Sequence, residues 1–291
     1  MKKDALIIVR GGGDLATGTI HRLWSAGFRV LVLEAPRPAA IRRRAAVCEA
    51  VYEKSTVVEG MEAVLICKAA EAEEVITSGR VPVLVDPEGE SIAALKPAAV
   101  VDAILAKRNL GTNRGMAPLT IALGPGFTAG ADVDVVIETM RGHDLGRVIR
   151  TGTAQPNTGI PGNIGGYTSE RVLHAPAAGI FYGVRQIGDI VAAGEEIAFI
   201  APVCETGTEQ KMSAAAPVCG AQCAEKVSVT SSISGVLRGL LRDGYPVTEG
   251  FKVADIDPRR EERKNCFTIS DKARCIAGGV LEAVCAELCR E

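Results

Sequence analysis

The sequence is poor in aromatic residues, in histidine and in net charge. Of its 291 residues, 4% are aromatic and three are histidine, and the formal net charge is −2. A charge so close to zero excludes a general basic field that would attract nucleic acid. Apolar runs are too short to cross a membrane, and the first apolar run is too short for a secretory signal. We therefore expect a cytoplasmic protein with neither a nucleic-acid nor a membrane partner.

Cysteine and glycine, by contrast, are plentiful. The chain has nine cysteines, an odd number, and no secretory context, so we expect free thiols rather than a disulfide framework. Two interpretations stay open for them: small buried apolar side chains, or sulfur, selenium or metal chemistry. Cys67, Cys219 and Cys223 are the candidate thiol carriers. Cys204 with the C-x3-C pair is a poor zinc signature, so we expect no metal site.

The first 34 residues predict a strand, a glycine turn, a helix and a second strand. "DALIIVRGG" is an apolar strand, "LATGTIHRLWSAGF" has a helical apolar stripe, and "RVLVLE" is a second strand. The turn matches G-x-G-x-x-A, and Glu34 follows Gly11 by 23 residues, about where an acid meets a ribose in dinucleotide-binding units. We expect a Rossmann-like parallel sheet here, with Glu34 facing a ribose. The expected phosphate site is bounded by Gly11, Gly12, Gly13, Asp14 and Ala16.

Asp14 stands at the edge of this glycine loop, where a carboxylate would repel a bare diphosphate. One interpretation makes it the N-cap of the following helix. The other gives it a functional role, in meeting a metal, a proton or a ligand N–H group. Arg10 and the run Arg42–Arg44 could offset its charge.

Polar loops follow the later apolar strands. Asp86 and Asp102 end two of these strands, at the edge where open α/β sheets hold ligands. "AKRNLGTNRG" comes next and is either a charged linker or a set of anion donors that includes Lys107 and Arg108. Further loops offer backbone amides or polar side chains to a ligand. Their candidate residues are Gly124 and Gly126 in "GPGF", His143 in "RGHDLG" and Thr151 in "RTGTAQPNTGIPG".

A repeat dominates the second half of the chain. Three glycines recur 56 residues later: Gly179, Gly188 and Gly194 return as Gly235, Gly244 and Gly250. Each copy, 175–200 and 231–256, predicts strand, turn and strand, and one copy cannot bury its own face. The unit resembles the half-motif of biotinyl and lipoyl domains, a flattened barrel of two interlocked halves. The insert 202–227 holds Lys211, but its length and the Gln210 before that lysine speak against cofactor attachment.

We therefore expect an α/β chain in which a Rossmann-like domain (1–110) is followed by a β-rich connecting region (111–170). A mostly β, barrel-sandwich-like domain (171–258) with the duplicated half-motif comes next. A C-terminal helical segment (259–291) completes the chain, and Ser270 or Asp271 lies near the N-cap of its helix.

Four blocks of the sequence carry a resemblance: "VRGGGDLATGTIHRL", "VPVLVDPEGESIAALKPAAVVDAILAKRN", "LGPGFTAGADVDVVIETMRGHDLGRVI" and "TISDKARCIAGGVLEAV". Together they resemble the YqeB-type selenium-dependent molybdenum hydroxylase accessory proteins. Through the first domain the chain is also similar to the XdhC/CoxI family, whose glycine loop has the form G-x-G-H-x-A. Asp14 stands where that family has histidine, which is a departure from its pattern.

The resemblance implies a maturation protein for a selenium-dependent molybdenum hydroxylase. It would bind a nucleotide or the molybdenum cofactor, as molybdopterin or its dinucleotide, and assist insertion or modification. The implied partners are the client hydroxylase, selenium or sulfur donor proteins, and a second copy of the chain. The alternatives are an NAD(P)-dependent oxidoreductase and a biotinyl- or lipoyl-like carrier or scaffold. No catalytic residue is assigned; Asp14, His143 and the three thiols are candidates.

Overall fold

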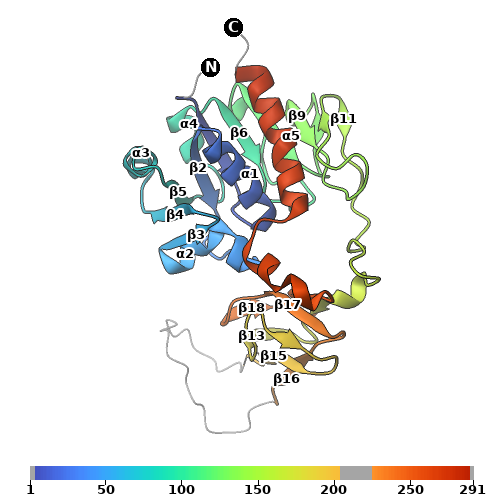
Figure 1. Cartoon of the computed structure of the whole chain (residues 1–291). Coiled ribbons are helices and arrows are strands. Elements are labelled where there is room, and N and C mark those ends of the chain that lie inside the picture. The colour runs from blue at the N-terminus through green and yellow to red at the C-terminus, as the bar shows by residue number, and fades with distance from the viewer. Residues whose placement is uncertain (1–3, 204–224, 289–291) are drawn as a thin grey trace. The chain divides into compact units, whose positions relative to one another are not determined.

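The computed structural model describes residues 4–203 and 225–288 (Figure 1). The chain divides into two compact units. Unit 1 comprises residues 1–162 and 264–291, and unit 2 comprises residues 163–263. This division differs from the four consecutive segments predicted from the sequence, because the C-terminal helix returns to the first unit.

Unit 1 is built on a nine-stranded mixed sheet with the order β10-β9-β7-β6-β1-β2-β5-β4-β3. The inner strands are parallel, and the two edge strands, β3 and β10, are antiparallel to their neighbours. The strands are β1 (Leu6–Arg10), β2 (Arg29–Glu34), β3 (Ser55–Val58), β4 (Met61–Ile66), β5 (Val81–Val85), β6 (Ala99–Asp102), β7 (Leu119–Leu123), β9 (Val135–Ile137) and β10 (Val148–Ile149). The short strands β8 (Thr128–Ala129) and β11 (Gly152–Thr153) form a separate pair.

Helices cover both faces of this sheet, so unit 1 has three layers. On one face, Ile7 and Val9 of β1 pack with Ile20 of α1 and Val280 of α5; on the other, Ile8 packs with α3 and α4. Because both faces of β1 are covered, its successive side chains from Ile7 to Val9 are all buried, which explains why this run is apolar throughout. The α-helices are α1 (Asp14–Ser25), α2 (Ala50–Glu53), α3 (Ala72–Thr77), α4 (Ser91–Leu95) and α5 (Asp271–Leu288). The 3-10 turns of unit 1 are η1 (Arg43–Ala45), η2 (Val47–Glu49), η3 (Ala69–Glu71) and η4 (Arg114–Met116), whereas η5 (Ser169–Arg171) belongs to unit 2 and η6 (Arg260–Phe267) spans the boundary between the units in the sequence.

Helices α1 and α5 lie against each other in Figure 1 although they come from opposite ends of the sequence. A Cβ atom on Gly18 of α1 would lie 2.8 Å from the backbone of Ala273, so only glycine permits this contact. The side chain of Ser270 accepts a hydrogen bond from the backbone N–H of Ala273 at 3.2 Å. The predicted cap at the start of the C-terminal helix is therefore confirmed, with Ser270 as the capping residue.

Unit 2 consists of two four-stranded antiparallel sheets, β12-β19-β17-β14 and β16-β15-β13-β18. The two sequence repeats exchange strands: β13 of the first copy pairs with β18 of the second, and β14 pairs with β17. Each copy also pairs two of its own strands, β13 with β15 and β17 with β19, and the other copy adds a strand beside them. The strands are β12 (Val172–His174), β13 (Gly179–Gly183), β14 (Ile190–Val191), β15 (Glu196–Ala201), β16 (Val227–Thr230), β17 (Gly235–Leu240), β18 (Tyr245–Val247) and β19 (Lys252–Asp257).

The repeated glycines of unit 2 serve the same purpose in both copies. A Cβ atom on Gly179 would lie 2.3 Å from the carbonyl oxygen of Ala201, and one on Gly235 would lie 2.3 Å from that of Asp257. The remaining repeated glycines have positive φ angles: 99° and 82° at Gly188 and Gly194, 76° and 78° at Gly244 and Gly250. Close backbone approach and turn geometry thus account for the repeat.

The fold class expected from the sequence is corrected by this architecture. The first unit has a large mixed sheet rather than a parallel Rossmann-like domain, because two hairpins add antiparallel strands at its edges. The second unit consists of two four-stranded antiparallel sheets rather than the expected biotinyl- or lipoyl-like barrel-sandwich. Lys211, Cys219 and Cys223 lie outside the described residues, as does most of the insert 202–227.

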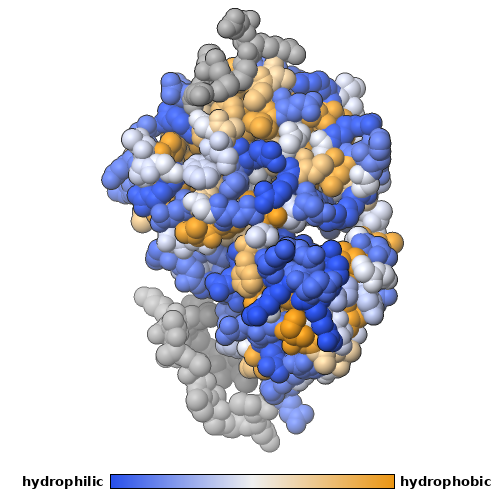
Figure 2. Space-filling model, viewed as in Figure 1, coloured by the Kyte–Doolittle hydropathy of each residue, from blue (hydrophilic) through white to orange (hydrophobic). Residues whose placement is uncertain are grey.

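The visible face in Figure 2 is mostly hydrophilic, with apolar residues scattered over it. The most exposed large apolar side chains of unit 1 are those of Ile160 (70%) and Val57 (62%). Among the helices of the described residues, none has the length and apolar character needed to cross a bilayer.

Candidate functional site

The chain of unit 1 changes direction across its sheet between β1 and β6. From β1 it proceeds through β2 to one edge, and it later returns to β6 on the other side of β1. In open α/β sheets, ligands bind outside the carboxyl ends of the strands at such a switch point. Here the loops after β1 and β6 touch, since a Cβ on Gly11 would lie 2.9 Å from the carbonyl oxygen of Ala103. This carboxyl edge is therefore the first place to seek a site.

The glycine loop after β1 has part of its hydrogen-bonding capacity filled by the protein itself. The N–H of Gly11 donates to the carbonyl of Leu33 at 2.7 Å, and the N–H of Gly12 donates to Oε2 of Glu34 at 2.7 Å. Burial raises the pKa of Glu34, although hydrogen bonds from the N–H groups of Ala35 and Gly12 oppose the shift. A dinucleotide or pterin diphosphate seated on the amides of Gly11 and Gly12 does not fit this arrangement, because the Glu34 carboxylate already occupies the second amide.

The carbonyl side of the same loop is also tied down. The N–H of Cys48 donates to the Gly12 carbonyl at 2.9 Å, and the hydroxyl of Thr17 donates to the Gly13 carbonyl at 2.9 Å. Cys48 is buried, and desolvation and the nearby carboxylates of Glu34, Glu49 and Asp14 raise the pKa of its thiol. Sequence reasoning did not select Cys48. Its spacing from the glycine loop contains no signal that would have done so.

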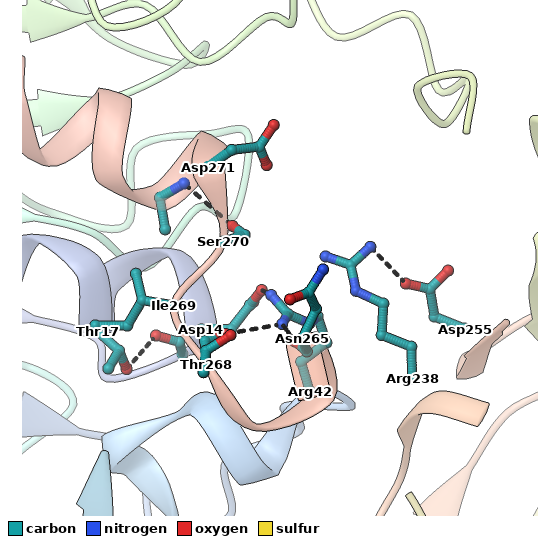
Figure 3. Close-up of polar contacts among 12 residues, drawn as sticks. Asp14, Thr17, Arg42, Arg238, Asp255, Asn265, Thr268, Ile269, Ser270 and Asp271 are labelled. Atoms are coloured by element: carbon teal, nitrogen blue, oxygen red, sulfur yellow. Dashed lines mark hydrogen bonds and ion pairs between the residues drawn. The ribbon is translucent and has the colours of Figure 1, made fainter. Parts of the chain in front are cut away.

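Asp14 does not cap helix α1. The N-cap residue is Gly13, which makes no side-chain cap, and Asp14 is the first residue of the helix. Its Oδ2 instead accepts a hydrogen bond from Nη1 of Arg42 at 3.1 Å, and the Arg42 side chain is only 6% exposed (Figure 3). The N-cap interpretation is therefore wrong. The suggestion that the Arg42–Arg44 run offsets the charge of Asp14 is confirmed for Arg42.

The two other aspartates predicted at this edge are satisfied internally. Asp86 accepts hydrogen bonds from three backbone N–H groups and from the Ser91 hydroxyl. Asp102 accepts from the Thr112 hydroxyl at 2.5 Å, and Arg10 donates to that same hydroxyl at 2.5 Å. Burial raises the pKa of Asp102, and the hydrogen bond from Thr112 and the positive charge of Arg10 oppose this shift. Both carboxylates thus stabilise loops rather than face a ligand.

Lys272, in the first turn of α5, carries a charge at this edge that no described residue pairs. Its side chain is half-buried, and its ammonium makes no hydrogen bond or ion pair to any described residue. Burial lowers the pKa of Lys272, and the positive charges of Arg141 and Lys107 lower it further, against Asp14 and Glu138, which raise it. A cation in the first helical turn also opposes the helix dipole. The fold therefore holds an unpaired ammonium where its own electrostatics disfavour it.

The start of α5 is fixed by contacts from three distant segments. Glu59, in the β3–β4 turn, accepts from the N–H of Ile269 at 2.8 Å and from Nη2 of Arg274 at 2.7 Å. Arg42 donates to the carbonyls of Asn265 and Thr268 at 3.0 and 3.1 Å. Arg141 binds both carboxylate oxygens of Asp271, at 2.8 and 3.1 Å. The position of the neighbouring Lys272 is thus well determined.

The contact between Glu59 and the start of α5 predicts an acid-sensitive contribution to stability. Desolvation raises the pKa of Glu59, but the hydrogen bonds from Ile269 and Arg274 outweigh it, so the pKa lies below its usual value. The contribution of this contact to the free energy of unfolding is therefore fully present above the pKa that Glu59 has in the unfolded chain. It is lost as the pH falls through the lower pKa that Glu59 has in the folded protein. We expect the stability difference between wild type and Glu59→Gln to shrink between pH 6 and pH 3 in urea titrations. A difference that grows on acidification would contradict the assignment.

Lys107 and Arg108 lie in a strained loop that meets the loop after β7. The φ angle of Lys107 is 62° and that of Leu105 is 60°, a conformation that costs non-glycine residues energy. A Cβ on Gly126 would lie 2.7 Å from Cα of Arg108, so the two predicted loops are in contact. A Cβ on Gly124 would lie 2.5 Å from Oγ1 of Thr139, which explains the other glycine of this loop by packing.

The remaining described residues that the sequence predicted form no hydrogen bond or ion pair with the charged residues around Lys272. The side chains of His143 and Thr151 are exposed and contact no hydrogen-bonding or ionic partner among the described residues. Cys67 is exposed at the end of β4, where its N–H donates to Glu71 at 3.0 Å. Ala16, a residue of α1, is buried in the core. In residues 4–203 and 225–288, no group of three or more His, Cys, Asp or Glu could hold a metal ion.

The fold and this edge define an α/β unit in which the cations Lys272, Arg141 and Lys107 lie at the carboxyl ends of the strands, with Lys272 half-buried. No family model matches the sequence. The chain is 48% identical over 279 residues, 96% of its length, to "Uncharacterized protein YqeB" of Escherichia coli strain K12. It spans about half (47%) of the length of that relative. The resemblance to YqeB-type proteins is therefore confirmed by sequence identity.

Among solved structures, the similarity is limited. An ectoine utilization protein EutE (DoeB) from Ruegeria pomeroyi is 10% identical, with a TM-score of 0.26, covering 87% of this chain and 85% of that one. An aspartoacylase family protein from Mesorhizobium loti is 10% identical, with a TM-score of 0.28 and coverages of 88% and 85%. A succinylglutamate desuccinylase/aspartoacylase from Rhodobacter sphaeroides is 12% identical, with a TM-score of 0.26 and coverages of 87% and 85%. Scores this low carry no activity over to this chain.

The function expected from the sequence is corrected by these comparisons. The YqeB relative is uncharacterized by name, so it gives no support for a role in molybdenum hydroxylase maturation. The maturation role is therefore withdrawn, together with its oxidoreductase and carrier alternatives. The similarity to XdhC/CoxI proteins finds no support either. The proposed cofactors and self-association remain untested predictions.

Proposed function

We propose that unit 1 binds a small anionic molecule at the carboxyl edge of its sheet, with Lys272 as the principal cation. The observation that supports this most strongly is the half-buried ammonium of Lys272, which lacks a hydrogen bond or ion pair among the described residues. Partly buried charges are normally paired, because desolvation without compensation is costly. A phosphate or carboxylate group would supply the missing partner and would also favour the first turn of α5.

The neighbouring charges direct the anion to Lys272 and Lys107. Arg141 is bound by Asp271, and Arg42 by Asp14, so these guanidinium groups are already compensated. The buried carboxylate of Glu138 accepts from the N–H groups of Met140 and Gln155 at 2.6 and 2.8 Å. Lys107 is exposed and makes no ion pair with the described residues. Two ammonium groups are therefore left for a ligand.

This geometry favours a single anionic group near Lys272 over a diphosphate laid along the glycine loop. Gly12 already donates to Glu34, whereas Lys272 has no ion-pair partner among the carboxylates of the described residues. The molybdenum cofactor and NAD(P) stay predictions as ligands. Either one would have to place its phosphate at Lys272 or displace Glu34 from the loop.

Binding of inorganic phosphate and pyrophosphate to the full chain tests the proposal. Lys272→Met is expected to weaken binding at least tenfold, because a charge-assisted hydrogen bond contributes about 1.5–3 kcal/mol. Titrations followed by isothermal calorimetry or by NMR shifts would measure the change. The matched control is Lys96→Met, which removes a charge from an exposed lysine before β6, at the opposite edge. Equal affinities for wild type and Lys272→Met would refute the proposal.

A further inference from the structure

Asp14 keeps one carboxylate oxygen open at the same edge. Its Oδ2 accepts from Arg42 at 3.1 Å, whereas its Oδ1 accepts no hydrogen bond from any described residue. The Asp14 side chain is 31% exposed, so this oxygen is accessible to a small molecule. The carboxylate is therefore a fixed acceptor with half of its capacity unused.

Asp14 and Lys272 lie in the first turns of α1 and α5. These two helices are so close that a Cβ on Gly18 would lie 2.8 Å from the backbone of Ala273, and Arg42 joins Asp14 to the carbonyl of Thr268. The negative charge of Asp14 opposes the lowering of the Lys272 pKa that burial and Arg141 cause, although Asp14 and Lys272 do not form an ion pair. Figure 3 shows Asp14 beside the segment that leads through Thr268 and Ser270 into α5. Because Asp14 and Lys272 do not pair with each other, a molecule that bears both a hydrogen-bond donor and an anionic group can satisfy both residues.

We propose that the ligand carries a hydrogen-bond donor, an N–H or ammonium group, beside its anionic group, and that Asp14 accepts from this donor while Lys272 binds the anion. This inference rests on the proposed function and names the chemical class of its ligand. A ligand with only an anionic group would satisfy Lys272 but would meet repulsion from Asp14. A ligand of mixed charge satisfies both residues.

Arg42 is the positioning residue for Asp14. Its buried guanidinium joins Asp14 of α1 to the carbonyls of Asn265 and Thr268, which precede α5. The contact fixes Asp14 relative to the start of α5 and so relative to Lys272. It also offsets part of the negative charge of Asp14, which would otherwise repel the anionic group. Arg42 touches no ligand in this account and acts through Asp14.

Two probes with the same phosphate test the ligand class on the full chain. Methyl phosphate has no donor beside its anionic group, and O-phosphoethanolamine has an ammonium. Wild type is expected to bind O-phosphoethanolamine about tenfold more tightly, as for a hydrogen bond between charged groups. Asp14→Asn is expected to abolish this preference without weakening the binding of methyl phosphate. Asp144→Asn, which alters a partly exposed carboxylate paired with Arg147, is the control and should keep it.

The role of Arg42 is tested in two backgrounds. Arg42→Met is expected to weaken methyl phosphate binding several-fold when Asp14 is present, because the bared carboxylate repels the anion. In the Asp14→Asn background the same substitution should have little effect on affinity. Equal losses in both backgrounds would indicate a purely structural role and would overturn the positioning role.

The outcomes separate this inference from the proposed function. If neither probe binds wild type, the anion-binding function itself is refuted. If both bind with equal affinity, or if Asp14→Asn keeps the preference for O-phosphoethanolamine, the ligand class assigned here is wrong and the anion-binding proposal stands.

Discussion

Replacing Gly279 with alanine is expected to destabilise unit 1 by about 2–3 kcal/mol, as for other overpacked sites. A Cβ at this position of α5 would lie 2.2 Å from the carbonyl oxygen of Gly146 and 3.1 Å from Cγ2 of Ile137. The nearest atom belongs to the backbone of a turn and cannot rotate away as a side chain would. The helix would have to move off the sheet, at a cost in buried contacts.

The neighbouring glycine provides a matched control for this substitution. A Cβ on Gly278 would meet nothing within 4 Å, although it lies in the same helix. Gly278→Ala is therefore expected to stabilise unit 1 by up to about 1 kcal/mol through helix propensity alone. The fluorescence of Trp24, the one tryptophan of the chain, reports unit 1 in urea titrations because α1 packs on α5. Similar effects for the two substitutions would contradict the close packing of α5 against the turn at Gly146.

Replacing Asp255 with alanine is expected to destabilise unit 2 by about 3–5 kcal/mol. The residue is only 4% exposed, and its carboxylate pairs with Arg171 and lies 3.7 Å from Nη1 of Arg238. Both arginine side chains are largely buried, at 10% and 13% exposed. Removing the shared carboxylate leaves two largely buried guanidinium groups near each other without this anion to offset their charges.

Unit 2 has no tryptophan, so its unfolding must be followed separately from that of unit 1. Tyrosine fluorescence and circular dichroism, compared with the Trp24 signal, would assign the loss of stability to unit 2. The control is Lys226→Met, which breaks an exposed ion pair with Glu196 and should change stability by less than about 1 kcal/mol. If Asp255→Ala cost no more than this control, the buried charge cluster would not support the unit.

Local patterns in the sequence predicted the elements near the site well. The strand, glycine turn, helix and second strand of the first 34 residues form as expected, since apolar periodicity and glycine act over short distances. Ser270 caps α5 as expected. Residue patterns also selected Lys107, Arg108 and the glycines after β7 as separate candidates, and the structure brings their loops into contact. Lys272 was missed, because a lysine in a C-terminal helix resembles any solvated charge.

The sequence by itself determined the local elements of this protein, its repeat in the second half and the glycines that its turns require. Only the tertiary structure decided the partners of its charged groups. Arg42 bonds Thr268, 226 residues away, and Glu34 reaches back 22 residues to the amide of Gly12. Such pairings depend on which segments the packed core brings together, and electrostatic energy depends on distance and burial rather than on order along the chain. For this reason the glycine loop could be recognised in the sequence, but the unpaired ammonium beside it could not.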